Sequence, residues 1–176
     1  GGSTDGFFLK FSSSGVRQWG TYYGGSGAAQ GEGCATDANG NVYLVGSAAS
    51  GSGLSTLGSH QNAYGGAWDV YLVKFNGNGV RQWGTYYGSS LNEQPYSCST
   101  DAAGDVYITG VTNTNTGTVI ATAGSHQSIL GGGSDAFLAK FNTNGIRQWG
   151  TYYGGAGSDV GATCAFDAFG NGYLAG

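Results

Sequence analysis

The string RQWGTYYG occurs three times in this chain, starting at Arg17, Arg81 and Arg147, so that successive copies are 64 and 66 residues apart. Two further strings keep the same order and spacing around it. DGFFLKF, DVYLVKF and DAFLAKF precede the three copies, and CATDANGNVYLVG, CSTDAAGDVYITG and CAFDAFGNGYLAG follow them. Internal similarity at a fixed period is the signature of a repeat architecture, so the chain is interpreted as repeats before anything else.

The repeats make the 176 residues a single array, with units at about 5–68, 69–134 and 135–176, the last one truncated. In the middle copy, four apolar runs at 96–100, 105–110, 136–141 and 146–153 are separated by Asp, Asn and Gly or by a linker of about 24 residues. Short apolar runs bounded by turn-forming residues predict an antiparallel meander of four strands per unit, with essentially no helix.

Both faces of the predicted strands are apolar. In residues 69–75, Tyr71 and Val73 face one side of the strand, whereas Val70 and Leu72 face the other. A sheet with one wet face would alternate cleanly, so these sheets should lie between neighbours. The expected fold class is all-β, a β-propeller of four-stranded antiparallel blades; a linear β-solenoid is the alternative, although its repeats are usually shorter.

The predicted strands run along the chain in groups of two, four, four and two, which is about three blades' worth. Closed propellers usually have about four to eight blades. We therefore expect a partial propeller that is completed by the remaining blades of a longer chain or by a second copy. In the isolated chain, apolar side chains at the two ends should be exposed, namely Phe7, Leu9, Phe11, Tyr173 and Leu174.

The net charge and the low content of charged residues limit the kinds of partner that this chain can bind. The net charge is −4, with only 9% charged residues and 14% aromatic residues. Disorder normally goes with high charge and few aromatics, so the chain should fold. An acidic chain is a poor match for nucleic acid or for an anionic membrane surface. No apolar run approaches the roughly 20 residues of a membrane span, so membrane insertion is not expected.

All six basic residues recur once per unit, and so do six of the ten acidic residues. Charge that repeats with the fold indicates structure rather than catalysis. We predict that Arg17, Arg81 and Arg147 each form an ion pair with a repeated aspartate. The repeated aspartates are Asp5, Asp69 and Asp135 at one position, and Asp37, Asp101 and Asp167 at the other.

No metal or cofactor site is expected. The three cysteines, Cys34, Cys98 and Cys164, share one repeat position without CxxC spacing, which makes neither a disulfide framework nor a zinc site. They should be small buried residues. The aspartates that begin the DxxG strings should cap their own turns; each turn offers only one or two carboxylates, which is few for calcium.

Three residues are candidates for ligand contact. Trp68 interrupts the repeat, because Thr4 and Ser134 occupy the corresponding positions, whereas the tryptophan of RQWGTYYG recurs and should pack between blades. His60 and His126 lie in two copies of a GSHQ string in the linkers. Hydrogen bonds that stabilise the linker are the other explanation for these histidines.

At these strings, the sequence resembles the bacterial SBBP-type β-propeller repeat family. The resemblance rests on DxFLxKF, GxRQWGTYYGG, DxxGNVYLxG and GSHQ, and it covers nearly the whole chain. It is specific for the type of repeat and not for any activity. It implies a bacterial protein that is secreted or displayed on the cell surface, with propeller repeats that serve adhesion or display.

The expected function is therefore a non-catalytic structural or interaction module, extracellular or at the bacterial cell surface, which binds a glycan or a protein through its loops. No catalytic residue is assigned, because no GxSxG, HExxH, P-loop or pair of catalytic acids stands out. The alternative is a fragment of a propeller enzyme acting on polysaccharide, a glycosidase or lyase. Such an enzyme would need irregular acids or a His–acid pair converging in a pocket.

Overall fold

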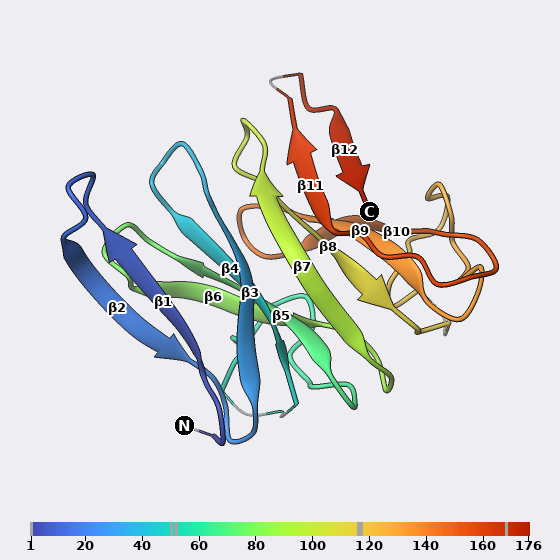
Figure 1. Cartoon of the computed structure of the whole chain (residues 1–176), viewed down its shortest axis with the longest axis horizontal. Helices are drawn as coiled ribbons and strands as arrows, with labels where there is room; N and C mark the ends of the chain where they lie inside the picture. Colours follow the sequence, from blue (N-terminus) through green and yellow to red (C-terminus); the bar gives the residue numbers. More distant parts are fainter. Residues whose placement is uncertain (1, 50, 52, 116–117, 168) are drawn as a thin grey trace.

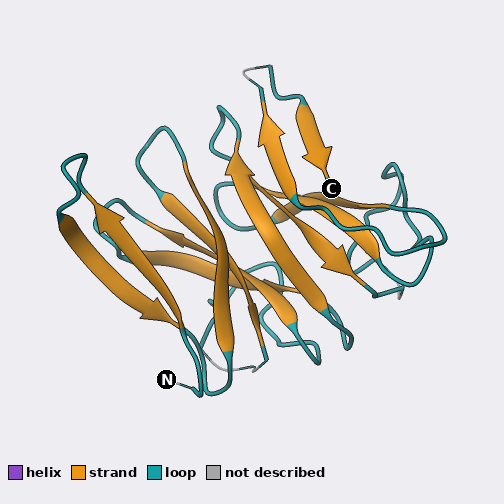
Figure 2. Cartoon of the chain, in the orientation of Figure 1, coloured by secondary structure: helices purple, strands orange, loops and turns teal. Residues whose placement is uncertain are grey.

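The computed structural model describes every residue except 1, 50, 52, 116–117 and 168. The described residues form twelve β-strands and no helix (Figure 2), which confirms the all-β prediction. In the described part of the chain there is accordingly no helix with the length and apolar character needed to cross a membrane.

The strands pair with their neighbours in sequence to form four antiparallel sheets, in the predicted grouping of two, four, four and two. The sheets follow one another in an open row (Figure 1). They consist of β1 (Gly6–Phe11) and β2 (Arg17–Tyr23); β3 (Ala29–Thr36), β4 (Val42–Ala48), β5 (Asp69–Phe75) and β6 (Arg81–Tyr87); β7 (Glu93–Thr100), β8 (Val106–Thr112), β9 (Asp135–Phe141) and β10 (Arg147–Tyr153); and β11 (Thr163–Phe166) and β12 (Gly172–Ala175).

The short turns between β3 and β4, β7 and β8, and β11 and β12 are closed by aspartate, as predicted. Asp37 Oδ1 accepts hydrogen bonds from the main-chain N–H groups of Asn39 and Asn41, both at 2.9 Å. Gly40 follows with φ of +75°, a conformation that glycine adopts without strain. The same bonds recur at Asp101 and Asp167. The carboxylates therefore act as main-chain caps in hairpin turns.

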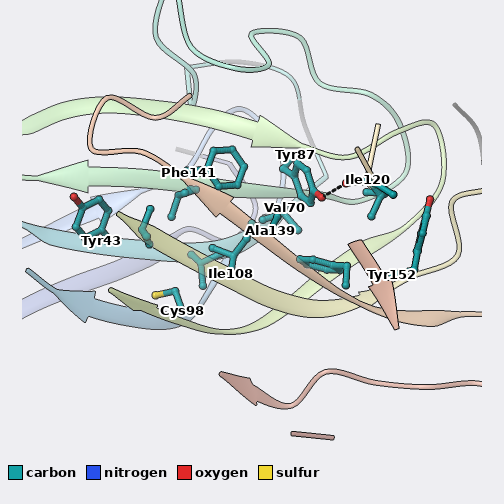
Figure 3. Packing of buried hydrophobic residues seen from close by; sticks show 14 of the residues in the cluster. Tyr43, Val70, Tyr87, Cys98, Ile108, Ile120, Ala139, Phe141 and Tyr152 are labelled. Atoms are coloured by element: carbon teal, nitrogen blue, oxygen red, sulfur yellow. Dashed lines mark hydrogen bonds between the residues drawn. The ribbon is translucent and has the colours of Figure 1, made fainter. Parts of the chain in front are cut away.

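Both faces of β5, an inner strand of the β3–β6 sheet, are buried, as its two-faced apolar pattern predicted. Every residue of β5 is buried. On one side, Val70 and Tyr87 pack with Ile108 and Phe141 of the next sheet (Figure 3). On the other side, Tyr71, Val73 and Phe75 pack with Phe8 and Tyr23 of the β1–β2 sheet; these five residues belong to a second core cluster.

The long linkers hold neighbouring sheets together. Tyr23 on β2 donates its hydroxyl hydrogen bond to the main-chain oxygen of Leu54, in the linker that joins β4 to β5 of the next sheet. Tyr87 on β6 repeats this bond to Ile120, with 2.7 Å between the oxygens (Figure 3). Each linker also bonds to its own sheet, since the main-chain N–H of Thr56 donates to Gly84 O on β6 at 2.8 Å. The linker is thus wedged between two adjacent sheets.

The predicted arginine–aspartate ion pairs are wrong. Arg81 Nη1 donates to the main-chain oxygen of Gly53 at 2.9 Å, and Arg147 Nη2 donates to that of Thr118 at 2.9 Å. Within the described residues, the ion pairs join Lys140 to Asp101 at 3.2 Å and to Asp105 at 2.9 Å. The reason is that the linker passes over the RQW residues and offers carbonyl oxygens that satisfy the guanidinium.

The expected exposure at the ends is confirmed for most of the named residues. Phe7 is 65% exposed and Phe11 is 54% exposed, whereas the corresponding Tyr71 and Phe75 are 0% and 3% exposed. Leu9 and Tyr173 are exposed as well. Leu174 differs, because it is half-buried and packs against the last core cluster, which consists of Tyr107, Leu138 and Cys164.

The cysteines depart from the prediction at one position. All three are free thiols; Cys98 and Cys164 are buried, but Cys34 is exposed. The backbone of Cys98 lies against Gly33 of the preceding sheet. Cys34, on β3, has only the β1–β2 sheet before it among the described residues, and that sheet leaves its side chain uncovered.

Candidate binding groove at Trp68

A groove of about 390 Å³ opens where β3 and β7 begin. Its lining comes from three strands and two connections. The residues that line it are Gln30, Ser47, Trp68, Asn92, Glu93 and Gln94. Trp68 is the last linker residue before β5, and Asn92 immediately precedes β7. The groove therefore lies between two neighbouring repeat units and draws on both.

The backbone fixes Trp68 beside the start of β7. Trp68 forms a parallel bridge with Asn92, in which the N–H of Glu93 donates to Trp68 O at 2.8 Å. The indole is half-buried. These main-chain hydrogen bonds fix the backbone from which the indole projects, so little backbone freedom is lost when a ligand packs against the ring.

The exposed polar side chains of the groove are amides rather than charged groups. Gln30 and Gln94 occupy the same repeat position on β3 and β7, and both are exposed. In the part of the chain that the structure describes, neither side-chain amide has a hydrogen-bond partner. Each offers a carbonyl acceptor and an NH₂ donor to a ligand. An aromatic face flanked by neutral amides suits polyhydroxylated or peptide-like ligands.

The next unit carries different residues at positions that form the Trp68 groove. Ser134 replaces Trp68, Ser158 replaces Asn92 and Val160 replaces Gln94. A second groove of about 290 Å³ shares only Asp159 and Val160 with the equivalent positions, and its other lining residues are Ala136, Tyr153, Leu174 and Gly176. The Trp68 indole and the Gln94 amide are therefore not repeated in the next unit.

His60 and His126 do not join Trp68 in the groove. The ring of His60 is 5.7 Å from that of Phe141 and 6.3 Å from that of Tyr87, between ring centroids. Burial, with the positive charge of Arg147 adding to it, lowers the pKa of His60 to about 4. His126 is exposed and stacks on Tyr153 at 5.8 Å. The candidate ligand residues predicted from the sequence therefore do not converge on one site.

The acidic residue of the groove is committed to hydrogen bonds. Glu93 is fully buried; its carboxylate accepts from the Ser89 N–H at 2.8 Å, from the Thr112 hydroxyl at 3.1 Å and from the Thr114 hydroxyl. Burial raises the pKa of Glu93, and these hydrogen bonds oppose that rise. The groups that the groove offers to a ligand are therefore an indole and side-chain amides, and not a free carboxylate.

Sequence reasoning missed the two glutamines. Their shared repeat position is a usable signal, because β3 and β7, the equivalent strands of neighbouring sheets, lie in contact with each other. Asn92 could not be found in this way, since its side chain has no counterpart with the same chemistry in the other units, which carry Ala28 and Ser158.

Comparison with known proteins gives one family match. Residues 18–52, from β2 to beyond the end of β4, match the SBBP family, described as a beta-propeller repeat. No curated protein matches the chain.

Proposed function

From the SBBP beta-propeller repeat that the chain carries at residues 18–52, we propose that this protein is a non-catalytic interaction module built as part of a β-propeller, and that it binds a glycan in the Trp68 groove. Each four-stranded sheet is one blade in this proposal. The protein acts outside the bacterial cell or at its surface, in adhesion or display.

The propeller arrangement is supported by contacts that recur from one sheet to the next. Trp19 on β2 donates its indole hydrogen bond to Gly77 O, and Trp83 on β6 donates to Thr143 O, one repeat later. Repeated contacts between successive sheets give an array with a constant step, and radial closure of such steps gives a propeller.

The ring is completed by the remaining blades of a longer chain or by a second copy. In the complete sheets, the second strand of a unit covers the edge of the third, as β4 covers β5 and β8 covers β9. The edge of β1 and the exposed ring of Phe7 lack such a strand among the described residues. An unpaired edge with apolar side chains beside it is a surface for strand pairing.

The single observation that carries the glycan proposal is the Trp68 indole, which is not repeated in the other units, in a groove that Gln30 and Gln94 also line with their side-chain amides. Trp68 offers a flat apolar face for the C–H side of a sugar ring. Gln30 and Gln94 offer both donors and acceptors to hydroxyl groups. The absence of a lysine or arginine among the lining residues favours a neutral saccharide over an acidic one.

A glycan array probed with the full chain tests the proposal, with Trp68→Ser and Gln94→Val as variants. Each installs the residue that the next unit carries at that position, so both substitutions have precedent in the same repeat. We expect binding to be lost in Trp68→Ser and weakened in Gln94→Val. Phe169→Ser removes an aromatic ring that is 91% exposed in the turn between β11 and β12, and this control should bind normally.

Two results would count against the proposal. Equal glycan binding by the unmodified chain and by the Trp68→Ser variant would show that the Trp68 groove is not the binding site. Release of reducing ends from a polysaccharide, by a hydrolase or lyase screen run in parallel, would favour a propeller enzyme instead.

A further inference from the structure

Two fully buried carboxylates lie at the starts of neighbouring strands, Asp69 on β5 and Glu93 on β7. Each closes the loop that precedes it. Asp69 Oδ2 accepts the Gly65 N–H at 2.6 Å, and Glu93 Oε2 accepts the Ser89 N–H at 2.8 Å. The donor lies four residues before the acid in both cases, so the two loops are capped in the same way.

The two acids meet at Gly88. A Cβ atom placed on this glycine would lie 2.5 Å from Glu93 Oε2 and 2.8 Å from Asp69 Oδ1. The two carboxylates therefore approach the same glycine, one from β5 and the other from β7. Asp69 Oδ1 is buried and accepts no hydrogen bond. In the described part of the chain, the ion pairs all involve Lys140, so neither acid is neutralised by a cationic side chain.

The next unit repeats this arrangement. Asp135 is fully buried, and its Oδ2 accepts the Gly131 N–H at 2.8 Å, while its Oδ1 is buried without a partner. A Cβ on Gly154 would lie 2.8 Å from Asp135 Oδ1 and 2.9 Å from Asp159 Oδ2. Asp159 thus occupies the place of Glu93, and the unpartnered oxygen recurs with it.

The first unit provides the contrast. Ala29 occupies the position of Glu93, so Asp5 lacks the acid that stands at this repeat position in the other two units. Asp5 is only half-buried, and its Oδ1 accepts the Gly2 N–H at 3.3 Å. The buried, unpartnered oxygen therefore occurs in the two units that have the second carboxylate and not in the unit that lacks it.

Two buried like charges without a counter-charge are unfavourable, and buried charges in proteins are normally paired or bound to a metal ion. Carboxylate oxygens are the ligands that Ca²⁺ prefers, and water can fill further positions in its coordination shell. We propose that each carboxylate pair, Asp69 with Glu93 and Asp135 with Asp159, binds a hard divalent cation of the Ca²⁺ type, with Asp69 Oδ1 and Asp135 Oδ1 as ligands. This inference does not depend on the proposed glycan binding.

Thermal unfolding of the full chain at neutral pH tests this, with EDTA, CaCl₂ or MgCl₂ present. A cation that binds only the folded state raises the Tm with concentration. We expect CaCl₂ to raise the Tm relative to EDTA. Glu93→Gln and Asp159→Asn should each reduce that rise, and the double variant should abolish it. Glu32→Gln removes one carboxylate elsewhere, on β3, and should keep the full rise.

Terbium luminescence provides a second measurement that does not depend on stability. Tb³⁺ binds at Ca²⁺ sites and is sensitised by nearby aromatic rings; Tyr86 lies close enough to Asp69 to feel its charge. The chain should give a signal that CaCl₂ displaces and that the double variant lacks. Asp159→Asn alone changes a half-buried residue, so it offers a folded variant even if Glu93→Gln does not fold.

Three outcomes would overturn the proposal. In the first outcome, CaCl₂ leaves the Tm of the unmodified chain unchanged and the Glu93→Gln substitution raises the Tm. The paired acids would then merely repel each other or share a proton. An equal Ca²⁺ response in the chain and the double variant would place the cation elsewhere. A terbium signal that persists in the double variant would do the same.

Discussion

Trp83 Nε1 donates a hydrogen bond of 2.9 Å to the main-chain oxygen of Thr143, which lies in the turn between β9 and β10 of the next sheet. Lys74 Nζ donates to the same oxygen at 3.2 Å. One unit earlier, Trp19 and Lys10 both donate to Gly77 O at 3.1 Å. A single carbonyl in each turn thus receives both repeated donors of the preceding unit.

We predict that Trp83→Phe lowers the free energy of unfolding by about 1 kcal/mol or somewhat more, because it removes the donor, leaves Thr143 O with one partner fewer and reduces packing volume. Trp149→Phe is the matched control. Its indole N–H has no hydrogen-bond partner within the described residues, so the loss should be clearly smaller. Urea unfolding followed by tyrosine fluorescence or circular dichroism measures both, and equal losses would contradict the role given to the hydrogen bond.

Tyr87→Phe should also destabilise the chain, by about 1 kcal/mol. Its hydroxyl lies 2.7 Å from Ile120 O and is completely buried, so the substitution leaves a buried carbonyl without that donor. Tyr153, one repeat later, is 60% exposed. Tyr153→Phe should therefore leave the unfolding midpoint unchanged, and a midpoint shift as large as that of Tyr87→Phe would refute the linker contact as its cause.

Stability should fall in mild acid because of His60. Burial lowers the pKa of His60 to about 4 in the folded chain, against about 6.5 in an unfolded one. Between these values the unfolded state binds more protons, so the free energy of unfolding decreases as the pH falls from 6.5 to 4. Replacing His60 with Gln should flatten this part of the pH–stability curve relative to His126→Gln, in which an exposed histidine is replaced. Two superimposable curves would contradict the prediction.

Phe75→Ala should cost about 3–5 kcal/mol, whereas Phe11→Ala should cost far less. The two residues are equivalent in the repeat, but Phe75 is 3% exposed between two sheets and Phe11 is 54% exposed on β1. Denaturant titration of the two variants provides the comparison. Similar losses would show that the face of β1 is covered in solution, and light scattering of the unmodified chain would then reveal the association that covers it.

The strands could be predicted because the same sequence signals for strands and turns recur in each unit. The turn residues and the two-faced apolar pattern are local signals, and three copies of them set the bounds of the strands within a few residues. Asp37 as a turn cap is local in the same sense, since its partners are two and four residues away.

The arginine partners could not be predicted in that way. Opposite charges at repeated positions suggested Arg81 with an aspartate, but a linker carbonyl 28 residues away takes the hydrogen bond. Which part of an irregular linker crosses a strand is decided by tertiary packing, and main-chain acceptors leave no trace in the residue types. The groove has the same difficulty, since Gln30 and Gln94 come together only because β3 and β7 lie side by side.

The position of the linkers between adjacent sheets also explains where the repeats differ in length. Thr56 and Thr122 each bond to a glycine 28 residues further along the chain, Gly84 and Gly150. The linkers also accept hydrogen bonds from tyrosines of the preceding sheet, and here the spacing differs: Tyr23 precedes Leu54 by 31 residues, whereas Tyr87 precedes Ile120 by 33. The two additional residues of the second spacing therefore fall before Ile120, and nothing changes after it. The length of each linker can therefore vary before its contact with the tyrosine, whereas its length after that contact is constant. A peptide tag inserted before Gly53 or before Thr118, whose carbonyls bind Arg81 and Arg147, should be accommodated. The same tag placed between Thr56 and β5, or between Thr122 and β9, should shift that strand against its neighbour.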